Sequence, residues 1–115
     1  MCIRDSIYAE VLDYSLTCDG FHPTRPLKET VAECLKLALE YSAVDPADID
    51  LVMAHGTATK ANDPMESWAF AYAFGGTDRI PPVAGIKSQV GHSMGGAAVH
   101  ACICLLYTSP SPRDS

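Results

Sequence analysis

Two segments with the same layout constrain the fold of this chain more than any other feature. Residues 51–66 (LVMAHGTATKANDPME) and residues 83–98 (VAGIKSQVGHSMGGAA) each begin with a short apolar run, continue as a loop and end where a helix is expected to begin. A short run that is apolar at every position is typical of a strand covered on both faces of a parallel sheet. The pattern predicts an α/β fold with His55, Lys87 and His92 near the carboxyl ends of strands, where ligands bind in open α/β sheets.

The remaining chain supplies a strand and a helix before these two segments. Residues 7–16 (IYAEVLDYSL) carry β-branched and aromatic residues in partial alternation and are predicted to form a strand, followed by a loop over residues 17–26. Residues 27–43 show the clearest helical period, with Val31, Leu35 and Ala38 on one stripe. Cys34 falls within the apolar width of this helix and is expected to lie in the core.

Two further helices are predicted from capping and stop signals. The first begins at Asp63, which is expected to cap it with Pro64 in the first position and Glu66 in the third, and it ends before two glycines at residues 75–76. The second covers residues 95–103, which are small and apolar, and is expected to be buried with its amino end beside His92. A helix amino end there would disfavour an imidazolium and keep His92 neutral.

Several chemistry-bearing residue types have simpler structural interpretations. Trp68, Phe70 and His100 are expected to be core residues, and His22 an exposed loop residue. The separations of the four histidines do not form a metal-binding motif, so no metal site is expected.

Three blocks of sequence, in order, carry a resemblance to a known family. HGTAT at residues 55–59, DPME at residues 63–66 and KSQVGH at residues 87–92 resemble the carboxy-terminal half of the β-ketoacyl-[acyl-carrier-protein] synthases, the condensing enzymes of fatty-acid and polyketide assembly. The resemblance covers nearly all of residues 7–103. It implies an α/β fragment of the layered α-β-α-β-α thiolase-like fold.

The resemblance also implies roles for six residues. His55 and His92 would be the histidines of a Cys-His-His triad that bind the malonyl carbonyl and support decarboxylation. Lys87 matches a lysine that organises the electrostatics of the site, and Glu66 an acidic residue paired with it, alongside the capping role above. The residues expected to hydrogen-bond the phosphopantetheine arm are Thr57 and Thr59, whose spacing suits an extended loop with both side chains on one side; ordinary turn chemistry is the alternative.

The implied activity is a decarboxylative Claisen condensation of an acyl thioester with malonyl-acyl carrier protein. Neutral histidine Nε2–H groups stabilise the developing enolate, and one such donor contributes about 2.7 to 4 kcal/mol. The implied partner is acyl carrier protein, the parent protein is expected to be a cytoplasmic homodimer, and no cofactor is expected because the carrier brings the phosphopantetheine. Ala58 departs from the family pattern, since glycine or serine is usual there.

The two ends of the chain differ from the rest. Residues 1–6 (MCIRDS) and 104–115 (CLLYTSPSPRDS) resemble the translation, on opposite strands, of a transposon-type sequencing adaptor, in which TGT CTC TTA TAC ACA TCT encodes CLLYTS. We therefore predict that both ends are adaptor read-through. Residues 7–103 are then an internal piece of a longer protein, part of its C-terminal ketoacyl synthase domain.

Charge and cysteine content exclude other classes. The net charge of −6 is unchanged without the two ends and argues against nucleic-acid binding. Residues 97–107 are apolar but too short to span a bilayer. The cysteines outside the ends, Cys18, Cys34 and Cys102, show no paired spacing and are expected to be buried free thiols in a reducing compartment.

The nucleophilic cysteine of such enzymes is expected upstream, because no retained cysteine lies in a small-residue elbow. The fragment alone is therefore predicted to be inactive. One alternative is a non-catalytic, chain-length-determining partner subunit of the same fold, although retention of His55, Lys87 and His92 argues against it. A thiolase acting on coenzyme A esters is a further alternative, but a different histidine motif would be expected.

Overall fold

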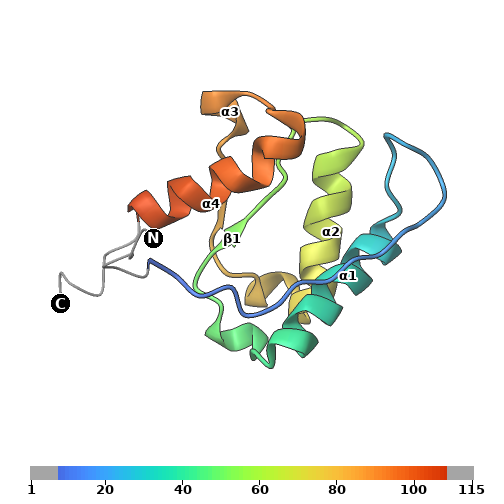
Figure 1. The fold of residues 1–115 in the computed structure, drawn as a ribbon. Helices are drawn as coiled ribbons and strands as arrows, with labels where there is room; N and C mark the ends of the chain where they lie inside the picture. The colour runs from blue at the N-terminus through green and yellow to red at the C-terminus, as the bar shows by residue number, and fades with distance from the viewer. Residues whose placement is uncertain (1–7, 109–115) are drawn as a thin grey trace.

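The computed structural model describes residues 8–108 of the chain (Figure 1). The predicted adaptor residues 1–6, together with residues 109–115, lie outside the described residues. Within residues 8–108, four α-helices, two short strands and three 3₁₀ turns follow one another in the order α1 (Lys28–Ser42), η1 (Pro46–Asp48), β1 (Val52–Met53), α2 (Asn62–Phe74), η2 (Thr77–Arg79), β2 (Val83–Ala84), α3 (Lys87–Val90), η3 (Met94–Gly96) and α4 (Ala97–Thr108).

The two predicted strands form a parallel pair. Val52 lies opposite Val83 and Met53 opposite Ala84, so the strands leave the sheet side by side and in the same direction. Hydrogen bonds on either side of this register extend the pairing, from Val52 N–H to the Pro82 carbonyl at 2.9 Å and from Ala54 N–H to the Ala84 carbonyl at 2.8 Å. Helix α2 makes the crossover between the strands, as a parallel connection requires.

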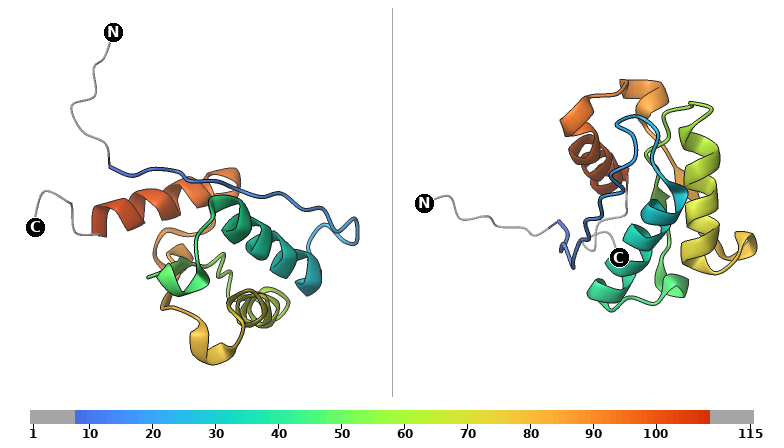
Figure 2. Two further views of the ribbon diagram at one scale, coloured as in Figure 1. Left: turned by 90° about the horizontal axis from the view of Figure 1, so that it is seen from below. Right: turned by 90° about the vertical axis from the view of Figure 1, so that its right-hand side faces the viewer.

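Helices α1 and α2 pack side by side (Figures 1 and 2) and form the small core. The buried apolar residues of the described chain are Ala32 on α1, fully inaccessible to solvent, and Ala69, Phe70 and Phe74 on α2. Phe70 is thus a core residue as predicted.

The start of α2 differs from the prediction that Asp63 caps it. The helix begins at Asn62, and Ala61 before it already has helical dihedral angles with no side-chain cap. The Thr59 hydroxyl accepts a hydrogen bond from the Asn62 backbone N–H at 3.2 Å. A side-chain acceptor at the start of the helix therefore comes from Thr59, which precedes the predicted cap Asp63 in the sequence. The predicted stop is confirmed, because Gly75 takes a left-handed conformation and the Gly76 N–H donates to the Ala71 carbonyl at 2.9 Å.

The predicted strand over residues 7–16 is wrong for the residues described. Residues 8–20 are an extended segment without a strand partner, and it runs along α1 (Figures 1 and 2). The contact is made through hydroxyl groups: Ser15 Oγ donates to the Cys34 carbonyl at 2.5 Å and Thr17 Oγ1 to the Thr30 carbonyl at 3.2 Å. A strand needs a neighbouring strand to pair with, and no residue within 8–108 pairs with this segment in that way.

The prediction that the last helix is buried is also wrong. Helix α4 is apolar, yet Val99 is 59% exposed and Ile103 58% exposed, because the described chain supplies little to cover it. The helix continues past residue 103, the predicted end of the natural segment, to Thr108. No helix within residues 8–108 is long and apolar enough to cross a membrane.

Three other burial predictions need correction. Cys18 and Cys102 are exposed and Cys34 is half-buried, so these thiols are not in the core. The Trp68 ring is 37% exposed and stacks on Tyr72 with ring centroids 5.3 Å apart. The His100 side chain is exposed, although its ring is hydrogen-bonded, whereas His22 is exposed in its loop as predicted.

The left-handed conformation of Gly75 generates a stability prediction. We expect Gly75→Ala to lower the free energy of unfolding by about 1 kcal/mol, because a Cβ disfavours positive φ. A Cβ built at Gly75 lies 3.8 Å from the nearest atom, an Arg79 side-chain nitrogen, so the cost is conformational rather than steric. Urea unfolding followed by circular dichroism measures the change.

Gly95→Ala is the matched control for this measurement. Gly95 does not have positive φ, and a Cβ there meets nothing within 4 Å. Equal effects of the two substitutions would contradict a conformational role for Gly75.

Candidate active site

The loop after β1 is held by a carboxylate from α2. Glu66 accepts hydrogen bonds from the backbone N–H groups of His55, at 2.5 Å, and of Gly56, at 2.9 Å. The Asn62 side-chain amide donates to the same carboxylate at 3.1 Å. Glu66 therefore fixes the path of the chain at His55 rather than closing a capping box on its own helix.

Lys87 also holds the backbone of His55, through its carbonyl group and not its N–H. Its Nζ donates to the backbone carbonyl of His55, which is 32 positions earlier in the sequence. The parallel pairing brings the two together, because Lys87 follows β2 directly after Gly85 and Ile86. The structure places Lys87 in the first turn of α3. No ion pair joins Lys87 to Glu66 within residues 8–108; the two groups meet instead through the backbone of His55.

The two predicted catalytic histidines are in contact. The ring centroids of His55 and His92 are 5.2 Å apart, with an angle of 79° between the ring planes, in an edge-to-face arrangement. They come from different loops, one after β1 and the other after α3. Residues 37 positions apart therefore form one pair of nitrogen-bearing rings at this edge of the sheet.

The tautomer of His92 is set by the backbone. The Met94 N–H donates to His92 Nδ1 at 3.0 Å, so this nitrogen carries no proton and the neutral ring keeps its proton on Nε2. Met94 makes this contact with a φ of 50°, a left-handed conformation that costs a non-glycine residue about 1 to 2 kcal/mol. The predicted helix amino end is further away, because α4 begins only at Ala97 after the 3₁₀ turn η3.

The surroundings of His55 favour the neutral form of its ring. Burial lowers the pKa of His55, the positive charge of Lys87 lowers it further, and Glu66 opposes them by raising it. The nearby His92 ring is a smaller contribution in the lowering direction. A neutral imidazole keeps one N–H donor and carries no positive charge.

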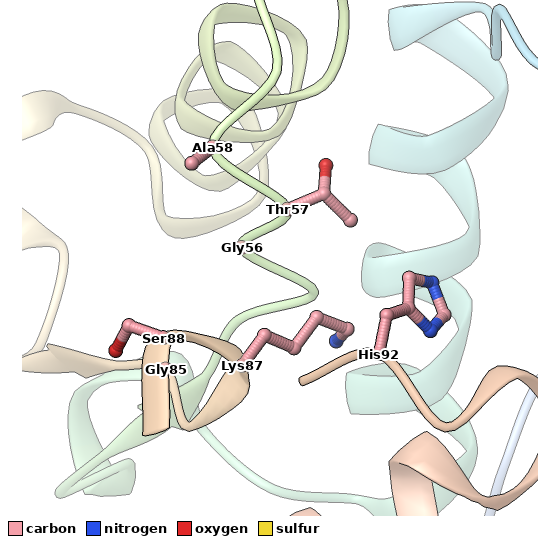
Figure 3. A pocket seen from close by; sticks show the side chains of 7 residues that line it. All are labelled: Gly56, Thr57, Ala58, Gly85, Lys87, Ser88 and His92. Carbon is pink, nitrogen blue, oxygen red and sulfur yellow. The ribbon is translucent and has the colours of Figure 1, made fainter. Parts of the chain in front are cut away.

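A cavity of about 300 Å³ lies beside these groups (Figure 3). It is lined by Gly56, Thr57, Ala58, Gly85, Lys87, Ser88 and His92. Figure 3 shows the Lys87 side chain extending toward His92 across one side of the cavity. Sequence reasoning missed Gly85 and Ser88 as site residues, although their positions two before and one after Lys87 are a signal that they share its surroundings.

The two predicted arm-binding threonines are placed differently from each other. Thr57 lines the cavity, whereas Thr59 does not. Their hydroxyl oxygens are 3.1 Å apart, so the side chains lie on the same side of the loop as the spacing predicts. Between them, Ala58 has a φ of 58°, which explains why a glycine would suit this position. Thr59 also has a structural role, since its hydroxyl accepts from the start of α2.

The arrangement offers two imidazole rings and one ammonium group beside a cavity. Such donors stabilise an oxyanion that develops on a bound carbonyl compound. No group of three or more histidine, cysteine, aspartate or glutamate side chains among residues 8–108 is placed to hold a metal ion.

The sequence of this chain is similar to that of a known protein family. The family described as "Beta-ketoacyl synthase, C-terminal domain" matches residues 8–108. The chain is 39% identical over 100 residues to 3-oxoacyl-[acyl-carrier-protein] synthase 1 of Haemophilus influenzae, an alignment that covers 87% of this chain and 23% of that protein. The curated relatives that it matches are much longer, and the chain spans 21 to 24% of the length of the most similar ones.

Solved structures agree with the sequence match. The ishigamide ketosynthase/chain length factor superposes with a TM-score of 0.80 and 43% identity over 88% of this chain and 25% of that one. A type II polyketide synthase acyl-carrier protein in complex with its ketosynthase bound to the hexaketide gives a TM-score of 0.74 and 27% identity over 95% of this chain and 30% of that one. The α/β fragment thus has the thiolase-like fold of ketosynthases, and the chain belongs to the family of beta-ketoacyl synthase C-terminal domains.

Proposed function

We propose that this chain is the histidine-bearing portion of a β-ketoacyl-acyl carrier protein synthase that performs decarboxylative Claisen condensation. The observation that carries the proposal is the contact between His55 and His92 beside the cavity, with ring centroids 5.2 Å apart. Because the chain spans about a quarter of its relatives, the complete protein supplies the nucleophilic cysteine from another segment. The isolated chain is then inactive.

Each site residue has a defined task in this reaction. His55 and His92 donate N–H groups to the malonyl thioester oxygen, where negative charge develops as carbon dioxide leaves. Lys87 and Glu66 position His55 through its backbone carbonyl and N–H, and the charge of Lys87 favours the neutral ring. The carbanion then attacks the acyl thioester on the cysteine of the complete protein and releases that thiolate as the new carbon-carbon bond forms.

The proposed partner is acyl carrier protein. Support comes from the ketosynthase whose structure was solved with its acyl-carrier protein and from the relative named 3-oxoacyl-[acyl-carrier-protein] synthase. The phosphopantetheine arm enters the cavity along Thr57, with Thr59 holding the loop, and the enzyme needs no cofactor of its own. The complete protein is proposed to be a cytoplasmic homodimer.

A second candidate is a non-catalytic partner subunit that determines chain length. It is favoured by the similarity to a structure named as a ketosynthase/chain length factor. It is opposed by the retained His55, Lys87 and His92, since a purely structural subunit needs none of the three. Long-read sequencing of the source DNA across both ends separates the candidates: an upstream cysteine in a small-residue elbow supports the enzyme, and an inert residue there supports the partner subunit.

Substitution of either histidine tests the proposed chemistry. In the complete protein encoded by the uninterrupted gene, we expect His55→Ala and His92→Ala each to slow decarboxylation of malonyl-acyl carrier protein by about a hundred- to a thousand-fold, because each removes one preorganised donor. The measurement is release of carbon dioxide at saturating substrate.

His22→Ala is the control variant. His22 is an exposed loop histidine outside the cavity, and its Nδ1 accepts only from nearby Thr24. We expect its rate to match that of the unsubstituted protein. A rate in both site variants equal to that of the control would refute the proposed roles.

The protonation of His55 gives a pH-dependent prediction. Burial and Lys87 lower its pKa, so His55 should titrate below the ordinary histidine value of about 6.5. In Lys87→Met the repulsion is removed while burial remains, and the midpoint should move up toward the ordinary value. Nuclear magnetic resonance of the His55 ring protons measures both midpoints.

The lowered pKa of His55 also predicts how its contribution to the free energy of unfolding changes with pH. Between the lowered pKa and the ordinary value, the unfolded chain binds more protons at His55 than the folded chain. The contribution of His55 to stability is therefore fully present above the ordinary pKa and is lost as pH falls toward the lowered one. A Lys87→Met variant whose His55 midpoint moves down would contradict this assignment.

A further inference from the structure

A hydrogen bond next to the site joins the His92 loop to α4. Ser93 Oγ and His100 Nδ1 are 2.8 Å apart, across seven positions of sequence. The Ser93 hydroxyl donates when the neutral His100 ring presents an unprotonated Nδ1. Neither residue belongs to the cavity beside His55 and His92.

Ser93 is held by its backbone as well as its side chain. Its carbonyl accepts from the Gly96 N–H at 3.0 Å, which closes the 3₁₀ turn η3. The His100 ring, in turn, borders an apolar groove of about 340 Å³ together with Ile86, Val90 and Ile103. The ring thus lies at the edge of this groove, and its Nδ1 is within hydrogen-bond distance of Ser93 Oγ.

The residue after Ser93 makes the contact that sets the His92 tautomer. Met94 donates its N–H to His92 Nδ1 at 3.0 Å with a φ of 50°. A left-handed non-glycine residue persists only where its surroundings over-determine it. Ser93 lies between the two partners of this hydrogen bond, so whatever fixes Ser93 also fixes the turn.

We infer that His100 is a positioning residue for His92, acting through Ser93 to hold the left-handed turn at Met94 and so keep the His92 proton on Nε2. The inference rests on the proposed function for its consequence, because only an Nε2–H of His92 aimed at the substrate serves decarboxylation. It does not rest on that function for its test, since the tautomer of His92 is measured without substrate.

The decisive experiment reads the two ring nitrogens of His92 by nuclear magnetic resonance in the ¹⁵N-histidine-labelled chain at a pH where the ring is neutral. In His100→Leu, which removes the acceptor for Ser93, we expect the ratio of Nδ1–H to Nε2–H tautomer at His92 to rise about two- to five-fold, as loss of one modest hydrogen bond would cause. His100→Asn offers a side-chain oxygen acceptor and is expected to restore the original ratio at least in part.

Two further variants make the outcome unambiguous. Ser93→Ala removes the donor without changing α4 or the groove and should raise the ratio as His100→Leu does. His22→Leu removes another exposed histidine that lies outside this network and should leave the ratio unchanged.

Unchanged His92 nitrogen signals in both His100→Leu and Ser93→Ala would overturn the inference. If His100→Leu fails to fold, Ser93→Ala alone decides it. A changed tautomer ratio combined with unimpaired decarboxylation by His92→Ala in the complete protein would instead sustain the positioning role and overturn the proposed function.

Discussion

The parallel pairing of β1 with β2 is the constraint on which the site depends. The register of Val52 with Val83 and Met53 with Ala84 makes both strands end at one edge, so that loops 32 positions apart in sequence meet there. Only a few backbone hydrogen bonds make this pair, and α2 must cross between the strands to allow it. The packing of α1 on α2, with two buried phenylalanine rings, is what holds that crossover in place.

His55 is fixed through its backbone rather than through its ring. Glu66 accepts a hydrogen bond from the His55 N–H, and Lys87 donates one to the His55 carbonyl. The two opposite charges are therefore separated by one peptide segment and do not meet directly. Both charges consequently act on the ring: Lys87 lowers the pKa of His55 and Glu66 raises it. The position of the ring and its protonation are thus set by the same two side chains.

Sequence reasoning predicted the local parts of this structure well. The helix over residues 28–42, the two short strands and the glycine stop at Gly75 follow from patterns within a few residues, and the spacing of the motifs placed both histidines at one sheet edge. The family of the chain was also predicted correctly from three ordered blocks.

The predictions that proved wrong concern interactions that no local sequence pattern encodes. Residues 8–16 have strand-forming composition, but they contact α1 and no residue within 8–108 pairs with them as a strand. Helix α4 has the composition of a buried helix, yet burial depends on what packs against it, and the chain covers only about a quarter of its relatives' length. Asp63 has the right residue type for a cap, but Thr59 supplies the acceptor first. The contact of Met94 with His92 depends on one unusual φ, which composition does not reveal.

Different interactions set the lowered pKa of His55 and the tautomer of His92, and this difference decides how each ring responds when the site is covered. Burial is the largest cause of the lowered pKa of His55, so a longer protein that covers the cavity would desolvate the ring further and strengthen the shift in the same direction. The tautomer of His92 depends on a backbone contact that spans two positions and is complete in this chain. His92 is therefore pre-set by local structure, whereas His55 reaches its full shift only when the site is closed to water.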